Sequence, residues 1–146
     1  MAELNVLSSG LLKVFVYGTL KPGEESYQAY CAANVVDVTE AIAWGQLFAL
    51  PMGYPAMTLG DSPVRGYVLT FADETVLTAL DEWEDYHPSR DPSQNLYNRQ
   101  QIKTHDLQGH FLTQAWVYIM TQELTSQLGG VLVPNGWWSS SVNYEL

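Results

Sequence analysis

Short runs of apolar, β-branched and aromatic residues recur along the chain and end at glycine, proline or other turn residues. Runs of this length and composition are typical of β-strands. They predict five strands, at residues 13–17, 44–50, 64–71, 96–104 and 111–121. The last two runs are separated only by the polar turn HDLQG, which predicts that they pair as a hairpin.

Two further segments, residues 24–33 and 73–84, space their apolar residues at intervals of three and four. This is the period of an amphipathic helix. The second segment has the clearer pattern, because Asp73 is a favourable N-cap and a single apolar stripe follows it. The stripe consists of Val76, Leu77, Leu80 and Trp83. The tail, residues 129–146, is expected to pack on the domain before its polar end.

The order of these elements bears on the fold class. Strands outnumber helices and do not alternate regularly with them, which argues against a doubly wound fold. The pattern favours an α+β domain built on an antiparallel or mixed sheet, either open or closed into a barrel. With 146 residues and no repeat or linker, the chain is predicted to form one domain over residues 1–146.

The charge balance restricts the partners. The chain carries 16 acidic and 6 basic residues, a formal net charge of -10. This excess disfavours nucleic acid and anionic membrane surfaces, both of which require positive charge. No segment reaches the roughly 20 apolar residues of a membrane helix, and the first residues lack the pattern of a secretory signal. Cys31 is the only cysteine, so no internal disulfide is expected. We therefore predict a cytoplasmic protein.

Four carboxylates, Asp81, Glu82, Glu84 and Asp85, gather in the last turn of the second predicted helix. Acidic residues there face the negative end of the helix dipole, which reverses their usual placement. At helical spacing, Glu84 lies within about 20° of Leu77 in the apolar stripe, whereas Glu82 points about 140° away from it. The sequence thus predicts that Glu84 borders the buried stripe and that Glu82 faces water.

Three influences would disfavour ionisation of Glu84: partial burial, neighbouring negative charge and the helix C-terminus. All three raise a carboxyl pKa. A carboxylate with a raised pKa serves as a general base that can return its proton. The same cluster is also compatible with a solvated, fraying helix end.

A glycine-containing loop follows the first predicted strand. Gly18 and Gly23 have the spacing of a phosphate-binding loop, but Glu24 and Glu25 stand where that motif needs Lys and Ser or Thr. The amides of residues 17–20 remain as a small anion-binding concavity suited to a carboxylate. A simple turn after the strand is the alternative.

Three segments, VFVYGTLKPG, LDEWEDY and YNRQQI, occur here in the order and at the separation seen in a known family. The chain resembles the γ-glutamylcyclotransferase-like proteins, particularly the branch that contains γ-glutamylamine cyclotransferase. WGQLFALPMGYPAM, AWVYIM and VPNGWW extend the likeness over roughly residues 14–138.

The resemblance implies a small mixed β-barrel flanked by a few short helices. It implies an enzyme that converts a small γ-glutamyl amine or amide into 5-oxoproline and a free amine without a cofactor. Glu84 matches the catalytic glutamate. Matching positions expected to bind the substrate are Tyr17, Gly18, Thr19 and Leu20 in the loop, and Tyr97 and Tyr118 near the pocket. Many relatives have glycine directly after the catalytic glutamate, where this chain has Asp85.

Several alternatives stay open. A hydrolytic relative would activate water with the same base, and a binding module would keep the pocket without turnover. The irregular segment 86–95 is a candidate cover for the pocket, and both a monomer and a homodimer are compatible with the sequence. His105 and His110 flank the hairpin turn without a cysteine partner, so no metal site is predicted. Cys31 lies in an apolar stripe, which favours a buried, inert thiol over a pair with His87.

Overall fold

The computed structural model describes residues 11–144. In chain order its elements are β1 (Leu12–Val16), α2 (Glu25–Tyr30), β2 (Val35–Ala49), β3 (Pro55–Leu59), β4 (Ser62–Phe71), α3 (Val76–Trp83), the 3-10 helix η1 (Pro92–Gln94), β5 (Asn98–His105), β6 (Phe111–Ile119), α4 (Gln122–Gln127) and β7 (Val131–Leu132). The five predicted strands are present, and the last two, β5 and β6, form the predicted antiparallel hairpin.

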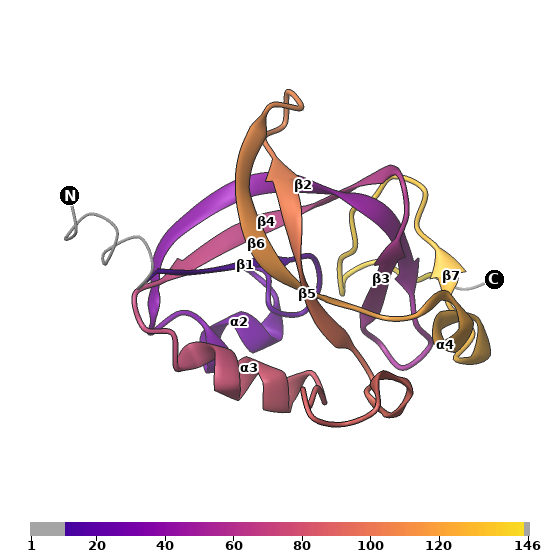
Figure 1. The fold of residues 1–146 in the computed structure, drawn as a ribbon. Helices are drawn as coiled ribbons and strands as arrows, with labels where there is room; N and C mark the ends of the chain where they lie inside the picture. Colours follow the sequence, from indigo (N-terminus) through magenta and orange to yellow (C-terminus); the bar gives the residue numbers. More distant parts are fainter. Residues whose placement is uncertain (1–10, 145–146) are drawn as a thin grey trace.

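Five of the strands close into a barrel (Figure 1). The order is β2-β4-β1-β6-β5, and β5 returns to β2 through the pair Ile42 and His105. Strand β1 is antiparallel to β4 and parallel to β6, so the sheet is mixed. Strands β3 and β7 add to β2 outside this ring. The predicted α+β fold, a small mixed barrel with a few short helices, is confirmed.

Strand β2 is much longer than the predicted strand at 44–50. Its first part pairs with β4 and its last part with β3, and Gly45 has a partner in both strands. A Cβ at Gly45 would lie 2.5 Å from the carbonyl oxygen of Thr58, so only glycine lets the two strands approach here. The first part of β2 was not predicted; four of its first six residues, Val36, Asp37, Val38 and Glu40, are exposed, so it lacks the regular alternation of a half-buried strand.

Strand β1 is buried on both faces, which explains its nearly continuous apolar composition. Leu12, Val14 and Val16 belong to a cluster that includes residues of α3, whereas Phe15 and Tyr17 belong to a second cluster with residues of β2, β4 and β6. Successive side chains of β1 therefore pack into two different clusters, so the strand connects the barrel with the helices. Figure 1 shows α2 and α3 together beside the barrel, near β1.

Helix α3 begins at Val76, later than the predicted start at residue 73. Asp73 nevertheless caps the turn before it, because its carboxylate accepts hydrogen bonds from the amide (2.9 Å) and hydroxyl (2.8 Å) of Thr75. These bonds lower the pKa of Asp73. Helix α2 is likewise shorter than the predicted 24–33, since the amides of both Cys31 and Ala32 turn back to the carbonyl of Tyr27.

Four elements were not predicted: β3, the 3-10 helix η1, α4 and β7. The first lies in a segment rich in turn residues, and β7 is only two residues long. The predicted strand 111–121 ends early, because the amide of Met120 donates to Met57 of β3 and Thr121 caps α4. Among the described residues, no helix is long and apolar enough to cross a membrane.

The tail packs on the domain, as predicted, as far as residue 144; residues 145 and 146 lie outside the described part. Trp138 is buried, and its carbonyl accepts a hydrogen bond from the ammonium of Lys21. Lys21 is 1% exposed, and its ammonium also lies 4.3 Å from the centre of the Trp137 ring. Burial lowers the pKa of Lys21 to about 8. These contacts of Lys21 with the tail therefore stabilise the loop that follows β1.

Candidate active site

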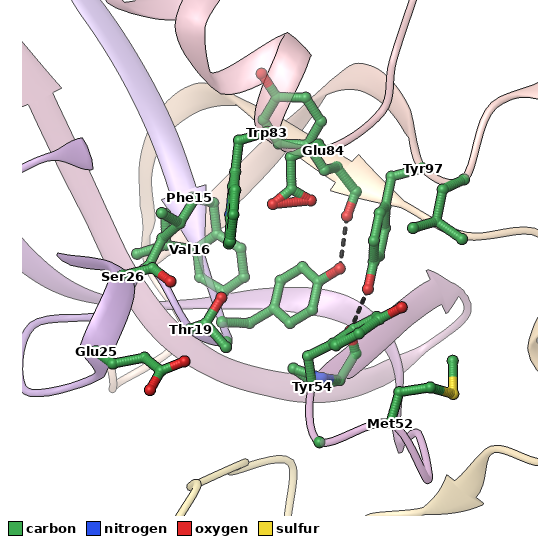
Figure 2. Close-up of a pocket in the computed structure, with 17 residues that line it drawn as sticks. Phe15, Val16, Thr19, Glu25, Ser26, Met52, Tyr54, Trp83, Glu84 and Tyr97 are labelled. Atoms are coloured by element: carbon green, nitrogen blue, oxygen red, sulfur yellow. Dashed lines mark hydrogen bonds between the residues drawn. The ribbon is translucent and has the colours of Figure 1, made fainter. Parts of the chain in front are cut away.

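A pocket of about 300 Å³ opens where β1 ends, between the start of α2, the end of α3 and the connection from β2 to β3 (Figure 2). Every site residue named from the sequence lies on its wall: Tyr17, Gly18, Thr19, Leu20, Glu84, Tyr97 and Tyr118. The remaining wall residues were not predicted: Phe15, Val16, Glu25, Ser26, Met52, Gly53, Tyr54, Pro55, Trp83 and Leu96. Segments that are distant in the sequence thus meet in one cavity.

The loop after β1 presents free backbone donors. The carbonyl of Gly18 accepts a hydrogen bond from Lys21 (3.0 Å), and that of Thr19 accepts one from Ser26 (3.1 Å). Within residues 11–144, the amides of Gly18, Thr19 and Leu20 have no backbone or side-chain acceptor. Three successive amides without partners on a pocket wall suit an anion such as a carboxylate.

Glu84 directly follows the last helical residue of α3, and its amide still donates to Leu80 (2.9 Å). The carboxylate points into the pocket beside Trp83 and Tyr97 (Figure 2). The side chain is partly buried, and within the described residues no Lys, Arg or His pairs with it. Burial raises the pKa of Glu84 to about 8. Glu84 is thus suited to exchange a proton near neutral pH, whereas Glu82 is exposed, as predicted.

Of the three causes predicted for this raised pKa, the structure supports burial. The negative charges of the neighbouring carboxylates are instead compensated by arginine side chains. Asp81 binds Arg99 (2.6 Å) and accepts a hydrogen bond from the hydroxyl of Tyr118 (2.7 Å). Asp85 lies 3.3 Å from Arg90. The acidic helix end is therefore an ordered network and not a fraying terminus.

Asp85 occupies the position at which the resemblance led us to expect glycine. It is the one described non-glycine residue with a positive φ, 56°. Asp tolerates this left-handed conformation better than most residues. Arg90 holds it there, donating to the Asp85 carbonyl (2.8 Å) and to the side chain of Asn95 (2.7 Å). Asp85 thus makes the turn that glycine would make beside Glu84.

The segment 86–95 does not line the pocket, contrary to its expected place as a cover. Asn95 ties the segment to itself, because its side chain accepts hydrogen bonds from both Arg90 (2.7 Å) and the amide of His87 (3.1 Å). The segment therefore supports the turn at Asp85, while Leu96 and Tyr97 beyond it reach the pocket.

The hydroxyls of three wall tyrosines, Tyr17, Tyr97 and Tyr118, bind backbone groups or Asp81. Tyr17 donates to the carbonyl of Tyr118 (2.6 Å) and accepts from the amide of Met57 (3.2 Å), and Tyr97 donates to the carbonyl of Pro55 (2.6 Å). Burial is the main cause that raises the pKa of Tyr17, Tyr97 and Tyr118. These neutral tyrosines hold the strands around the cavity in a fixed arrangement.

Among the residues that the structure describes, no group of three or more His, Cys, Asp or Glu side chains is placed so that it could hold a metal ion. His110 is exposed in the hairpin turn, 3.5 Å from Asp106. Cys31 is buried in the core, and burial raises its pKa to about 11, which makes the thiol a poor nucleophile.

The raised pKa of Glu84 predicts a pH-dependent stability. A carboxyl group with a pKa of about 8 when folded and 4.5 when unfolded contributes full stability below pH 4.5, and that stability is lost as the pH rises through 8. Between pH 6 and pH 9, wild type should lose about 1–2 kcal/mol more unfolding free energy than Glu84→Gln, after a discount for partial exposure. Urea unfolding curves across this range measure the difference.

Glu82→Gln is the matched control for this measurement, because Glu82 is exposed on the same helix. It should follow the wild-type pH profile. A constant difference between wild type and Glu84→Gln at every pH would contradict the raised pKa of Glu84.

Comparisons with known proteins agree with this geometry and confirm the resemblance seen in the sequence. The model of the family described as "Gamma-glutamyl cyclotransferase, AIG2-like" matches residues 14–140. A protein of Niallia circulans named gamma-L-glutamyl-butirosin B gamma-glutamyl cyclotransferase is 31% identical over 110 residues, which cover 75% of this chain and 67% of that protein.

Solved structures show the same fold. A crystal structure of an AIG2-like protein from Mus musculus has a TM-score of 0.66 at 21% identity, and the match covers 90% of each chain. A solution structure of an Arabidopsis thaliana protein has a TM-score of 0.62 at 20% identity, over 83% of this chain and 76% of that one. Because the family model extends over nearly the whole chain, this protein belongs to the gamma-glutamyl cyclotransferase, AIG2-like family.

Proposed function

We propose that this protein converts γ-glutamyl amines or amides into 5-oxoproline and the free amine, without a cofactor. One observation carries the proposal: Glu84 lines the same pocket as Gly18, Thr19 and Leu20, whose amides have no backbone acceptor within residues 11–144. Its volume of about 300 Å³ fits a small molecule.

The substrate supplies its own nucleophile. In a γ-glutamyl amide, the α-nitrogen attacks the γ-carbonyl carbon and closes a five-membered ring, and the bond from that carbon to the amine then breaks. A pocket that holds the α-nitrogen against the γ-carbonyl carbon provides much of the rate acceleration, because intramolecular reactions reach high effective molarities. The reaction therefore needs no nucleophilic side chain on the pocket wall.

The loop after β1 is suited to the glutamyl head. In the part of the chain that the structure describes, no Lys or Arg lies on the pocket wall, so the α-carboxylate of the substrate must find other donors. The amides of Gly18, Thr19 and Leu20 supply them without bringing a charged side chain into the cavity. One of these amides can also stabilise the oxyanion that develops on the γ-carbonyl.

Glu84 carries the proton in this scheme. Its carboxylate accepts a proton from the α-ammonium group, which frees the nitrogen to attack. The resulting carboxylic acid then gives the proton to the departing amine, so that the base is restored. The ring nitrogen loses a second proton as the ring closes, and the released amine takes it up and leaves as an ammonium ion. A pKa of about 8 suits both steps, since proton transfer is most efficient when donor and acceptor are nearly matched.

A product assay tests the proposal. Purified protein is incubated with a panel of γ-glutamyl amines in ¹⁸O-labelled water, and the products are identified by mass spectrometry. The panel includes γ-L-glutamyl-butirosin B, for which the relative from Niallia circulans is named. We expect unlabelled 5-oxoproline and free amine.

Two other outcomes would contradict the proposal. Glutamate that carries ¹⁸O would indicate hydrolysis by the same base. Tight binding of γ-glutamyl compounds without product would indicate a binding protein. Cytoplasmic location and the choice between monomer and homodimer stay predictions from the sequence.

A further inference from the structure

We infer that Glu25 and Trp83 form a subsite that selects substrates whose amine half carries a positive charge. This inference rests on the proposed function, because it assigns the part of the pocket that receives the leaving amine. It concerns the two features of the wall that the reaction itself does not use: an acidic side chain and an exposed indole.

Glu25 is an exposed carboxylate on the pocket wall without a basic partner. Among the described residues, no Lys, Arg or His comes within ion-pair distance of it. Its neighbour Glu24 is turned the other way, toward the buried ammonium of Lys21 at 3.8 Å. One acid of this adjacent pair thus supports the loop, while the other is left for a ligand.

Glu25 lies away from the proposed reaction centre. Figure 2 shows the Glu84 carboxylate at the top of the pocket and the Glu25 carboxylate at its lower left. The amides of Gly18 and Thr19 are assigned to the glutamyl head, which must also reach Glu84. Because the amine half extends beyond the γ-carbonyl, its far end is the part of the substrate that approaches the pocket margin.

Trp83 adds an aromatic surface to this margin. Its side chain is 43% exposed and lines the pocket, and its ring stacks on Tyr30 with 4.6 Å between ring centroids. Stacking fixes the ring in place without burying it. An indole face attracts an ammonium or guanidinium group. The Glu25 carboxylate on the same pocket wall attracts the same charge.

The charges of the pocket point the same way. Among residues 11–144, its wall carries two carboxyl groups, Glu84 and Glu25, and no Lys or Arg. An amine half ending in a carboxylate would meet Glu25 with like charge, whereas a cationic end would compensate it. The pocket thus favours amine halves with a second, charged amino or guanidino group over neutral or acidic ones.

Three γ-glutamyl amides test this inference. Their amine halves are four-carbon chains that end in an ammonium, a methyl or a carboxylate group, so that length stays similar while charge changes. We expect kcat/KM to be about five- to tenfold higher for the ammonium probe than for the methyl probe, and lowest for the carboxylate probe. Raising the salt concentration should weaken the preference.

Glu25→Gln should reduce the ratio of kcat/KM for the ammonium probe to that for the methyl probe to about one to two, mainly through a loss with the ammonium probe. Glu25→Lys should favour the carboxylate probe. The matched control is Glu123→Gln, because Glu123 also lies in the first turn of a six-residue helix but not on the pocket.

Turnover of the methyl probe separates the two proposals. If that probe yields 5-oxoproline but wild type shows no charge preference, or Glu25→Gln keeps the full preference, the subsite is wrong and the proposed function stands. If no probe yields 5-oxoproline, both are wrong.

Discussion

Replacement of Glu84 by glutamine is expected to lower the rate of 5-oxoproline formation by about 10³-fold or more, while the protein stays folded. Glutamine has nearly the same shape as the protonated side chain, which is the form that burial favours at neutral pH. It cannot accept a proton from the α-ammonium and return it to the leaving amine. The measurement is the single-turnover rate with a saturating γ-glutamyl amine.

Two controls accompany this variant. Glu82→Gln, two residues away on the exposed side of the same helix, should keep its rate within about twofold, because Glu82 is not on the pocket. Binding of 5-oxoproline to Glu84→Gln should persist, because the loop amides are unchanged. Equal losses in the two variants would show that Glu84 is not the proton carrier.

The position of Glu84 could be predicted because helical periodicity is a strong signal over three turns. Counting back to Leu77 and Leu80 placed Glu84 at the edge of the apolar stripe, and both leucines do belong to or pack against the core. The predicted start of α3 at Asp73 was wrong, since Asp73 caps a preceding turn that resembles the first turn of the helix in sequence. Local spacing thus predicted which side chain faces inward better than where the helix begins.

The charge environment of Glu84 could not be predicted from the same pattern. Adjacent acids in a sequence suggest mutual repulsion, but Asp81 and Asp85 find Arg99 and Arg90 in the folded protein. Arg99 comes from β5, 18 residues beyond Asp81, and the barrel closure brings it there. Ion pairs of this kind depend on how the chain is folded in space, and the periodicity of the sequence does not predict them.

Several residues of the pocket wall could not be predicted from the sequence, for a related reason. Met52, Gly53 and Tyr54 lie in a turn-rich connection, and Glu25 appeared only as a defect in a phosphate-loop motif. No regular spacing marks such residues, since loops are placed by the elements that they join. The resemblance identified the residues proposed to act on the glutamyl head, and the structure added those proposed to contact the amine half.

Replacement of Gly18 by alanine is expected to reduce kcat/KM by about 10²-fold, because misplacement of binding groups by about 1 Å has effects of this size. A Cβ at this position would lie 2.6 Å from Cγ and 2.9 Å from Cδ of Pro55. The proline ring cannot turn away as a flexible side chain could. The loop must therefore shift and carry the amides of Thr19 and Leu20 with it. Steady-state kinetics with one γ-glutamyl amine measures the loss.

Pro55→Ala provides the decisive comparison, because it removes the ring atoms that the new methyl group would meet and keeps the carbonyl that Tyr97 binds. In the double variant, kcat/KM should recover at least about tenfold over Gly18→Ala alone, as expected when two residues in contact are coupled. Unchanged activity in Gly18→Ala would contradict the role of the loop amides. Recovery would show that the backbone position of the loop, set against Pro55, determines how the glutamyl head is held.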